Sequence, residues 1–233
     1  MRHALAIALL LTCAACSQEE APADEVAEVA EEIVAPTPEP TPLARGKWAP
    51  QDDCGTVEGA NQFRERLAAA VDARDADALV ALAADDINLD FGGGAGKAEL
   101  RARLDDESRE LWGELDALMT LGCSANEQGG ITIPWYFDQD LGETDPYMAM
   151  LVTGENVPVV AEPKGSAQRI DIISWDLVEA VSFDPEAPFQ EIRLADDRTA
   201  FIQSDKLRSV LDYRLIASSR NGRWRITSFI AGD

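Results

Sequence analysis

Three features of the sequence have residue types that could carry chemistry: a glycine-rich loop, an alternating run of Asp and Asn, and two internal cysteines. The loop FGGGAGK, residues 91–97, has the composition of a phosphate-binding loop. That motif requires glycine where Phe91 stands and Ser or Thr where Ala98 stands. We therefore interpret the loop as a turn before a helix.

The oxygen-bearing side chains of Asp86, Asn88 and Asp90 have the alternation of a calcium loop. A calcium loop needs glycine at the position of Phe91 and glutamate at that of Lys97. The alternating residues are Ile87 and Leu89, which fits a half-buried strand better. We predict a strand here and no metal site.

The only histidine is His3, so cleavage before Cys16 would leave a mature chain without histidine. Such a chain has no Ser-His-Asp or Cys-His site and no histidine-ligated metal. Four aromatic residues could line a pocket: Trp112, Trp135, Tyr136 and Trp224. No sequence motif places a carboxylate among them. We name no catalytic residue, no metal ligand and no cofactor.

The charge balance is strongly acidic, with 43 Asp and Glu against 20 Lys and Arg and a net charge of −23. Nucleic-acid phosphates require clustered Lys and Arg, so this balance argues against nucleic acid as a partner.

The first fifteen residues have the pattern of a signal peptide, with Arg2 and His3 before an apolar stretch and small residues at Ala14-Ala15. Cys16 follows and resembles the acylated cysteine of a bacterial lipobox, although Cys13 replaces the usual leucine. The resemblance implies a bacterial envelope lipoprotein that faces the periplasm and reaches the membrane only through its lipid. An ordinary cleaved signal is the alternative. Ser17-Gln18 lacks the aspartate of inner-membrane retention, which favours the outer membrane.

Residues 16–47 are predicted to be a disordered tether. Its segment 17–44 contains eight acidic residues, five prolines, no basic residue and no aromatic residue. Such a composition cannot bury enough apolar surface to fold, and its proline-rich half favours an extended spacer.

The next hundred residues alternate helical and strand patterns. Apolar stripes predict helices at 61–71, at 76–83 behind the cap residue Asp75, and over 97–121, while 87–91 and 131–137 alternate like strands. Cys54 and Cys123 flank this unit, and in an oxidising compartment they are expected to form a disulfide. A reactive thiol pair is the alternative, although no C-x-x-C spacing supports it.

Residues 148–210 form a separate pattern of short strands and turns: VPVV, then ISWDLVEAV, then FQEIR, then TAFIQ before SDKL. This order resembles the bacterial SH3-like (SH3b) domain, in which a closing helical turn with leucine follows the last aromatic strand. Ala200 stands where the family has glycine. The resemblance implies a small all-β barrel, and Trp175, Phe189 and Phe201 are the candidates for a ligand groove.

Asn221-Gly222 between two alternating runs predicts a C-terminal β-hairpin. The order of helices and strands before it, with the segment NGRWRITSFIAGD, resembles the cone-shaped α+β fold of the ketosteroid-isomerase and nuclear-transport-factor superfamily. We therefore expect an α+β protein in which residues 48–147 and 211–233 form a cone-like domain. The SH3-like unit would be inserted before the hairpin, and a tandem layout is the alternative.

The function expected from these patterns is a non-enzymatic, lipid-anchored envelope protein whose SH3-like module binds peptidoglycan or an envelope protein. Two other classes remain: a small-molecule binder or enzyme that uses a pocket in the cone, and a structural subunit of an envelope complex.

Overall fold

The computed structural model describes residues 46–194 and 196–232, which fall in one compact unit. The described residues contain both helices and sheets, so the predicted α+β class is confirmed at that level. None of these helices is long and apolar enough to cross a membrane. The predicted signal peptide, Cys16 and all but the last two residues of the tether lie outside the described residues.

The first two helices form where the sequence predicts them. Helix α1 spans Ala60–Asp72 and buries one face, with Phe63, Leu67 and Val71 spaced at four residues. Helix α2 spans Ala76–Leu82, and the side chain of Asp75 accepts a hydrogen bond from the Ala78 N–H at 2.9 Å. This is a regular N-cap and sets the start of α2.

The prediction of a single helix over 97–121 is wrong. The structure divides it into α3, Lys97–Asp105, and α4, Leu111–Met119. The Asp106 carboxylate accepts hydrogen bonds from both the N–H and the hydroxyl of Ser108, and Glu110 has a positive φ of 50°. A side chain that bonds its own backbone competes with the helix, and residues 105–110 have no apolar side chain to hold the turn against the core.

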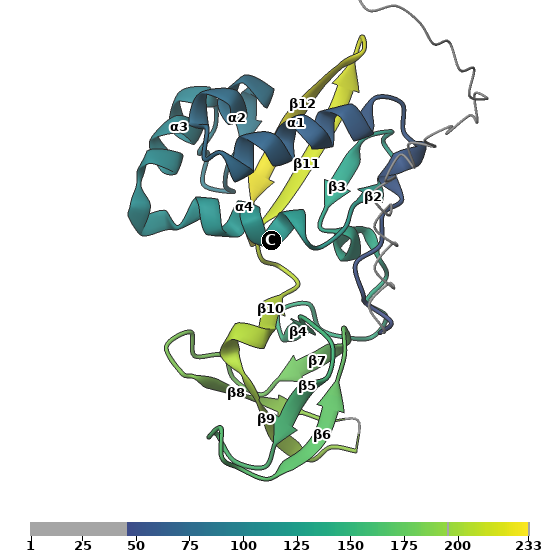
Figure 1. Cartoon of the computed structure of the whole chain (residues 1–233), viewed down its shortest axis with the longest axis vertical. Coiled ribbons are helices and arrows are strands. Elements are labelled where there is room, and N and C mark those ends of the chain that lie inside the picture. The colour runs from purple at the N-terminus through teal and green to yellow at the C-terminus, as the bar shows by residue number, and fades with distance from the viewer. Residues whose placement is uncertain (1–45, 195, 233) are drawn as a thin grey trace, which may run out of the picture. The chain divides into compact units, whose positions relative to one another are not determined.

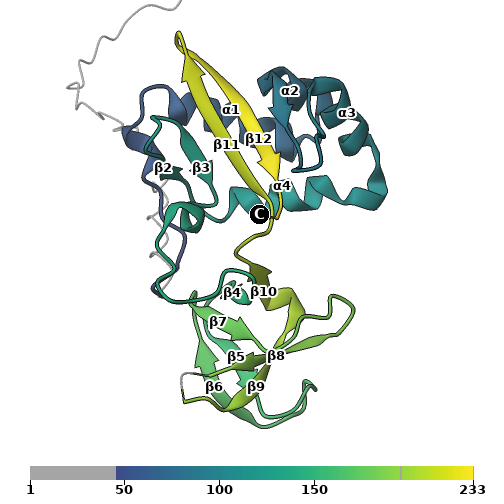
Figure 2. The same cartoon turned by 180° about the vertical axis from the view of Figure 1, so that it is seen from behind.

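A five-stranded sheet has the order β1-β12-β11-β3-β2. Its strands are β1 Ala83–Asn88, β2 Ser124–Ala125, β3 Ile131–Ile133, β11 Arg214–Arg220 and β12 Arg223–Ile230. In Figure 1 helix α1 crosses in front of β11 and β12, and in Figure 2 the two strands lie in front of the helix. The helices therefore cover one face of this sheet and leave β11 and β12 open on the other.

The hairpin predicted at Asn221-Gly222 is confirmed, because β11 and β12 pair antiparallel on either side of it. Both turn residues have positive φ, 53° and 73°, as a two-residue primed turn requires. The strand predicted over 131–137 ends earlier, at Ile133. Pro134 has no N–H for the ladder, and Trp135–Asp138 forms a 3-10 turn instead.

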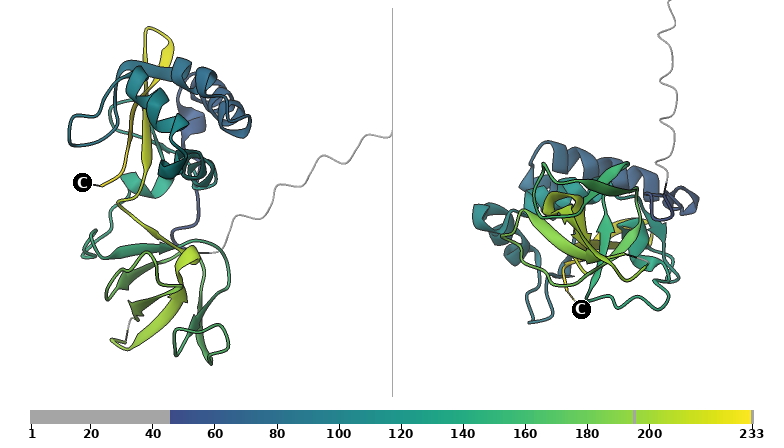
Figure 3. Two further views of the ribbon diagram at one scale, coloured as in Figure 1. Left: turned by 90° about the vertical axis from the view of Figure 1, so that its left-hand side faces the viewer. Right: turned by 90° about the horizontal axis from the view of Figure 1, so that it is seen from below.

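A seven-stranded antiparallel sheet has the order β10-β4-β7-β8-β9-β5-β6. Its strands are β4 Ala149–Val152, β5 Val157–Val160, β6 Arg169–Ile173, β7 Leu177–Ala180, β8 Phe189–Arg193, β9 Thr199–Gln203 and β10 Leu207–Ser209. The 3-10 turn η4, Ser204–Lys206, connects β9 to β10, where the sequence predicts one helical turn. Figure 3 shows these strands curling around one another.

Three apolar clusters hold the described residues together. The largest lies between the helices and the five-stranded sheet, and Phe63 stacks on Trp224 inside it. The second lies within the seven-stranded sheet and includes Val159, Ile192 and Ile202. The third joins residues distant in sequence: Trp48, Leu121, Trp135, Tyr136, Ala149, Leu151 and Val210.

Candidate functional site

Two adjoining hollows lie on the seven-stranded sheet along β7 and the end of β8. One encloses about 300 Å³ and the other about 380 Å³. They share Leu177, Val178, Arg193 and Leu194. We call the combined surface the β7–β8 groove. Each of the two volumes lies at the lower end of the range of small-ligand sites.

The rim of the β7–β8 groove carries more acid than base. Arg193 pairs with Glu179 at 3.3 Å, and Arg198 pairs with Asp196 at 2.7 Å, so both guanidiniums already face carboxylates. The other rim carboxylates are Asp171, Asp176 and Glu143. An apolar floor with an acidic rim suits a ligand that combines an amine with an apolar part.

Two rim carboxylates are oriented by the backbone. Asp171 accepts a hydrogen bond from the N–H of Ile172 at 2.7 Å, and Asp176 accepts one from the N–H of Leu177 at 2.9 Å. Both side chains belong to exposed residues, so their remaining lone pairs are open to a ligand.

The three aromatic residues predicted for a ligand groove lie in two different places. Phe189 and Phe201 are half-buried and alternate with buried residues on β8 and β9. Phe189 pairs with Gln203 and Glu191 with Phe201, so the two phenylalanines are diagonal neighbours on one face. Trp175 instead packs against the third cluster, and its carbonyl accepts the Trp48 N–H at 2.8 Å. None of the three lines the β7–β8 groove.

A buried charge cluster centres on Arg208 of β10, whose side chain is only 10% exposed. Its Nη1 lies 3.2 Å from Glu114 of α4 and 3.2 Å from Asp212, and Nη2 donates to the Tyr213 carbonyl. Nε of Arg208 and the hydroxyl of Tyr136 are buried without a hydrogen-bond partner among the described residues. We call this set the Arg208 cluster.

Burial sets the pKa values in the Arg208 cluster. It raises the pKa of Glu114, and the nearby Asp212 carboxylate raises it further against the opposing effect of Arg208. Burial likewise raises the pKa of Tyr136 to about 12. Tyr136 is therefore a neutral phenol at physiological pH. The sequence gives no sign of this cluster, because Glu114 and Arg208 are 94 positions apart.

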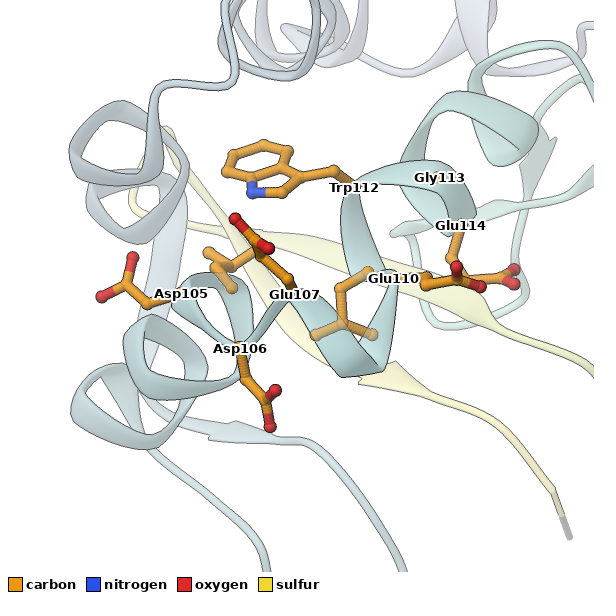
Figure 4. Close-up of a pocket in the computed structure, with 9 residues that line it drawn as sticks. Asp105, Asp106, Glu107, Glu110, Trp112, Gly113 and Glu114 are labelled. Carbon is orange, nitrogen blue, oxygen red and sulfur yellow. The ribbon is translucent and has the colours of Figure 1, made fainter.

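An acidic hollow of about 640 Å³ lies where α3 gives way to α4. Figure 4 shows Trp112 on one side of it, with the carboxylate of Glu107 beside the indole in this view. The Arg74 guanidinium carbon lies 5.7 Å from the centroid of the Trp112 ring, and Nη1 of Arg74 donates to the Trp112 carbonyl at 2.7 Å. The hollow therefore has a tryptophan fixed by an arginine and a rim of carboxylates.

The aromatic residues considered for a pocket in the cone do not gather in one place. Trp224 stacks on Phe63 in the largest core, and its Nε1 donates to the Glu58 carbonyl at 3.0 Å. Trp135 and Tyr136 belong to the third cluster, while Trp112 lines the acidic hollow. Such positions are typical of aromatic side chains that pack within the protein and do not line a common pocket.

The predicted disulfide is present: Cys54 and Cys123 are bonded, with Cα atoms 5.7 Å apart. The pair ties the start of the domain to the edge of its sheet, beside the backbone hydrogen bonds between Gln51, Asp53 and Cys123. A carboxylate oxygen of Asp52 lies within 4.8 Å of both sulfur atoms, but cysteines joined in a disulfide have no thiolate to offer a metal.

The glycine-rich loop is a turn held by Asp90. Its carboxylate accepts the N–H groups of Gly92 and Gly94, each at 2.8 Å, and pairs with Arg103. The hydrogen bond from Arg103, followed by that from Gly94, lowers the pKa of Asp90 to about 2. The carboxylate thus braces the turn before α3.

No family model, curated protein or solved structure matches this chain. The function is therefore inferred from the geometry of the described residues.

Proposed function

We propose that the protein is a non-enzymatic envelope protein, lipid-anchored at Cys16, that binds peptidoglycan or an envelope protein through an SH3-like module over residues 148–210. The observation that supports the proposal most is the β7–β8 groove, a concave acidic surface with an apolar floor on a small antiparallel sheet. Its short strands and the helical turn at Ser204–Lys206 are compatible with the resemblance to the SH3-like domain.

The layout supports insertion of this module into the α+β domain. The hairpin β11–β12 pairs with β3, and β12 pairs with β1, both of which precede β4–β10 in the sequence. The chain thus leaves one sheet after β3, completes the other, and returns. In the proposal the α+β domain supports the module and the Cys54–Cys123 disulfide closes that support.

The chemistry of the groove favours an amine-bearing peptide. Its excess carboxylates, Asp171 and Asp176, would pair with an ammonium group, while Leu177 and Leu194 would contact the aliphatic part. Peptidoglycan peptides carry amines, and so do basic segments of envelope proteins. Both hollows are lined by Leu177 and Val178 of β7, so a peptide laid along this strand would contact both.

The test is co-sedimentation of the full-length chain, kept in a mild non-ionic detergent, with purified peptidoglycan. The groove variant is D171N/D176N, which removes two negative charges but retains the oxygen that each backbone N–H requires. The matched control is E186Q, an exposed acidic position on the β7–β8 connection. A third variant, F189A/F201A, tests the aromatic pair.

Loss of pelleting in D171N/D176N alone would support the β7–β8 groove. Loss of pelleting in F189A/F201A alone would indicate that the binding site lies on the face of β8 and β9 that carries these two phenylalanines. If the wild-type chain does not pellet, peptidoglycan is excluded as the partner. Capture of a partner from envelope extracts that D171N/D176N abolishes would then support the envelope-protein form of the proposal, and capture that is unchanged would refute the groove.

A further inference from the structure

A basic hollow of about 420 Å³ lies beside the hairpin, lined by residues of β1, β11 and β12 and by the start of α3. Arg220, Arg223 and Arg225 line it from β11 and β12, and Lys97 lines it from the start of α3. Four of the 20 basic residues of a chain with net charge −23 therefore meet at one place.

Strand periodicity places these arginines together. On β12, Trp224 and Ile226 point into the largest core, so Arg223 and Arg225 lie on the opposite face. Arg220 is the direct cross-strand partner of Arg223, and Ser218 is the partner of Arg225. Like charges directly opposite one another destabilise a hairpin. The arrangement therefore needs a compensating negative charge.

The protein supplies only part of that charge. Lys97 pairs with Asp85 at 2.7 Å, and Asp86 is the other carboxylate on the hollow. Arg225 donates to the Trp224 carbonyl at 2.8 Å. Arg220 and Arg223 form no ion pair with any residue in the described ranges, and both are exposed. Four positive charges thus face two negative ones.

The backbone of β1 is shaped around the same hollow. Ala83 pairs with Ile226 and Asn88 with Ser228, so β1 carries extra residues between two positions that are close together on β12. The residues that bulge out include Ala84, Asp85 and Asp86, which line the hollow. Such irregularities re-aim side chains and are frequent beside binding sites.

We propose that this hollow is a binding site for a phosphate group with about two or more negative charges, as in a phosphomonoester or pyrophosphate. Arg220 and Arg223 would hold the phosphate oxygens as paired guanidinium forks, with Arg225 beside them. The hydroxyl of Ser218, which has no hydrogen-bond partner among the described residues, lies in the lining and can donate to an oxygen. The excess positive charge of the hollow matches the charge of such a group.

The shared chemistry could come from a soluble phosphate compound or from a phospholipid headgroup, and the experiment separates them. The full-length chain in mild detergent is titrated with inorganic pyrophosphate by calorimetry at low ionic strength. In a second arm it is titrated with short-chain phosphatidic acid, whose headgroup is a phosphomonoester, or with short-chain phosphatidylcholine, each dispersed in the same detergent. The site variant is R220Q/R223Q, and the matched control is R66Q, an exposed arginine on α1.

We expect pyrophosphate affinity to fall at least about tenfold in R220Q/R223Q and to remain in R66Q. Binding of phosphatidic acid, but not of pyrophosphate, that is lost in R220Q/R223Q would instead support a lipid source. Because both arginines are exposed and repel each other, the double variant should fold, and its circular dichroism melt checks this. D86N provides an independent measurement, with binding about two- to fivefold tighter because one repelling carboxylate is removed. Absence of binding in both arms, or equal binding by wild type and R220Q/R223Q, would overturn the proposal.

Discussion

Replacing Arg208 by methionine should destabilise the protein strongly at neutral pH. The change removes a guanidinium whose side chain is 10% exposed and which faces Glu114 and Asp212, each at 3.2 Å. Methionine retains the length and apolar contacts of the stem, so the loss is mainly electrostatic. Two carboxylates then face each other with no counter-charge.

The magnitude follows from burial. Removal of one partner from a fully buried ion pair costs about 3–5 kcal/mol. The side chains of Glu114 and Asp212 are 31% and 29% exposed, so water recovers part of that cost. We therefore expect R208M to lower the free energy of unfolding by about 2–3 kcal/mol at pH 7. R208K, which retains the charge, should lose less.

The dependence on pH provides a sharper test. Burial, and then Asp212, already raise the folded-state pKa of Glu114 above its ordinary value of 4.5. A carboxyl with a raised folded pKa contributes stability below its unfolded pKa and loses it as pH rises through the folded value. Removing Arg208 raises this pKa further. The penalty of R208M should therefore be largest near pH 7 and shrink as pH falls toward 4.

The assay is urea denaturation of wild type, R208M, R208K and E114Q between pH 4 and 7.5. E114Q should change the free energy of unfolding by less than about 1 kcal/mol, because ionised Glu114 is already disfavoured by burial. The double variant R208M/E114Q should recover part of the R208M loss. An R208M penalty that is independent of pH, or no penalty at all, would refute this account of the cluster.

Three further outcomes are expected. Y136F removes a buried hydroxyl that has no partner among the described residues, so it should leave stability unchanged or raise it by up to about 1 kcal/mol in the same denaturation assay. C54S/C123S should lose about 4 kcal/mol, because the bond closes a loop with a sequence separation of 69; an unchanged denaturation midpoint would contradict this. In an NMR titration the Asp90 carboxyl should titrate near pH 2, because Arg103 and then a backbone N–H hold its charged form. Its contribution to stability is present above the ordinary pKa of 3.8 and is lost as pH falls through about 2, and a titration near 3.8 would show that this brace is absent in solution.

The sequence predicts those elements that depend on residues close together in the chain. The cap at Asp75 and the primed turn at Asn221-Gly222 each depend on residues within a few positions of one another, and both are present. The cysteine pair could be proposed because only two cysteines follow Cys16. The sequence does not predict the break at Asp106, because the leucine stripe of a single helix continues on both sides of this one polar turn.

The candidate surfaces depend on pairing between distant strands, and periodicity alone does not fix that pairing. Phe189 and Phe201 become neighbours only through the register of β8 with β9, while Trp175 leaves the strand pattern with a positive φ of 43°. The sequence does contain one usable signal, RNGRWR at 220–225. Alternation around a two-residue turn already places Arg220, Arg223 and Arg225 on one face.

The two proposed sites differ in the sign of charge that they require, and this makes their tests independent. The β7–β8 groove offers carboxylates beyond those paired with Arg193 and Arg198, so it selects cationic groups. The hairpin hollow offers Arg220 and Arg223, so it selects anions. Salt weakens both interactions, but an ion of a single sign can occupy only one of the two sites. A variant of one site should therefore leave binding at the other unchanged, and loss of both in D171N/D176N would indicate a damaged fold and not two functions.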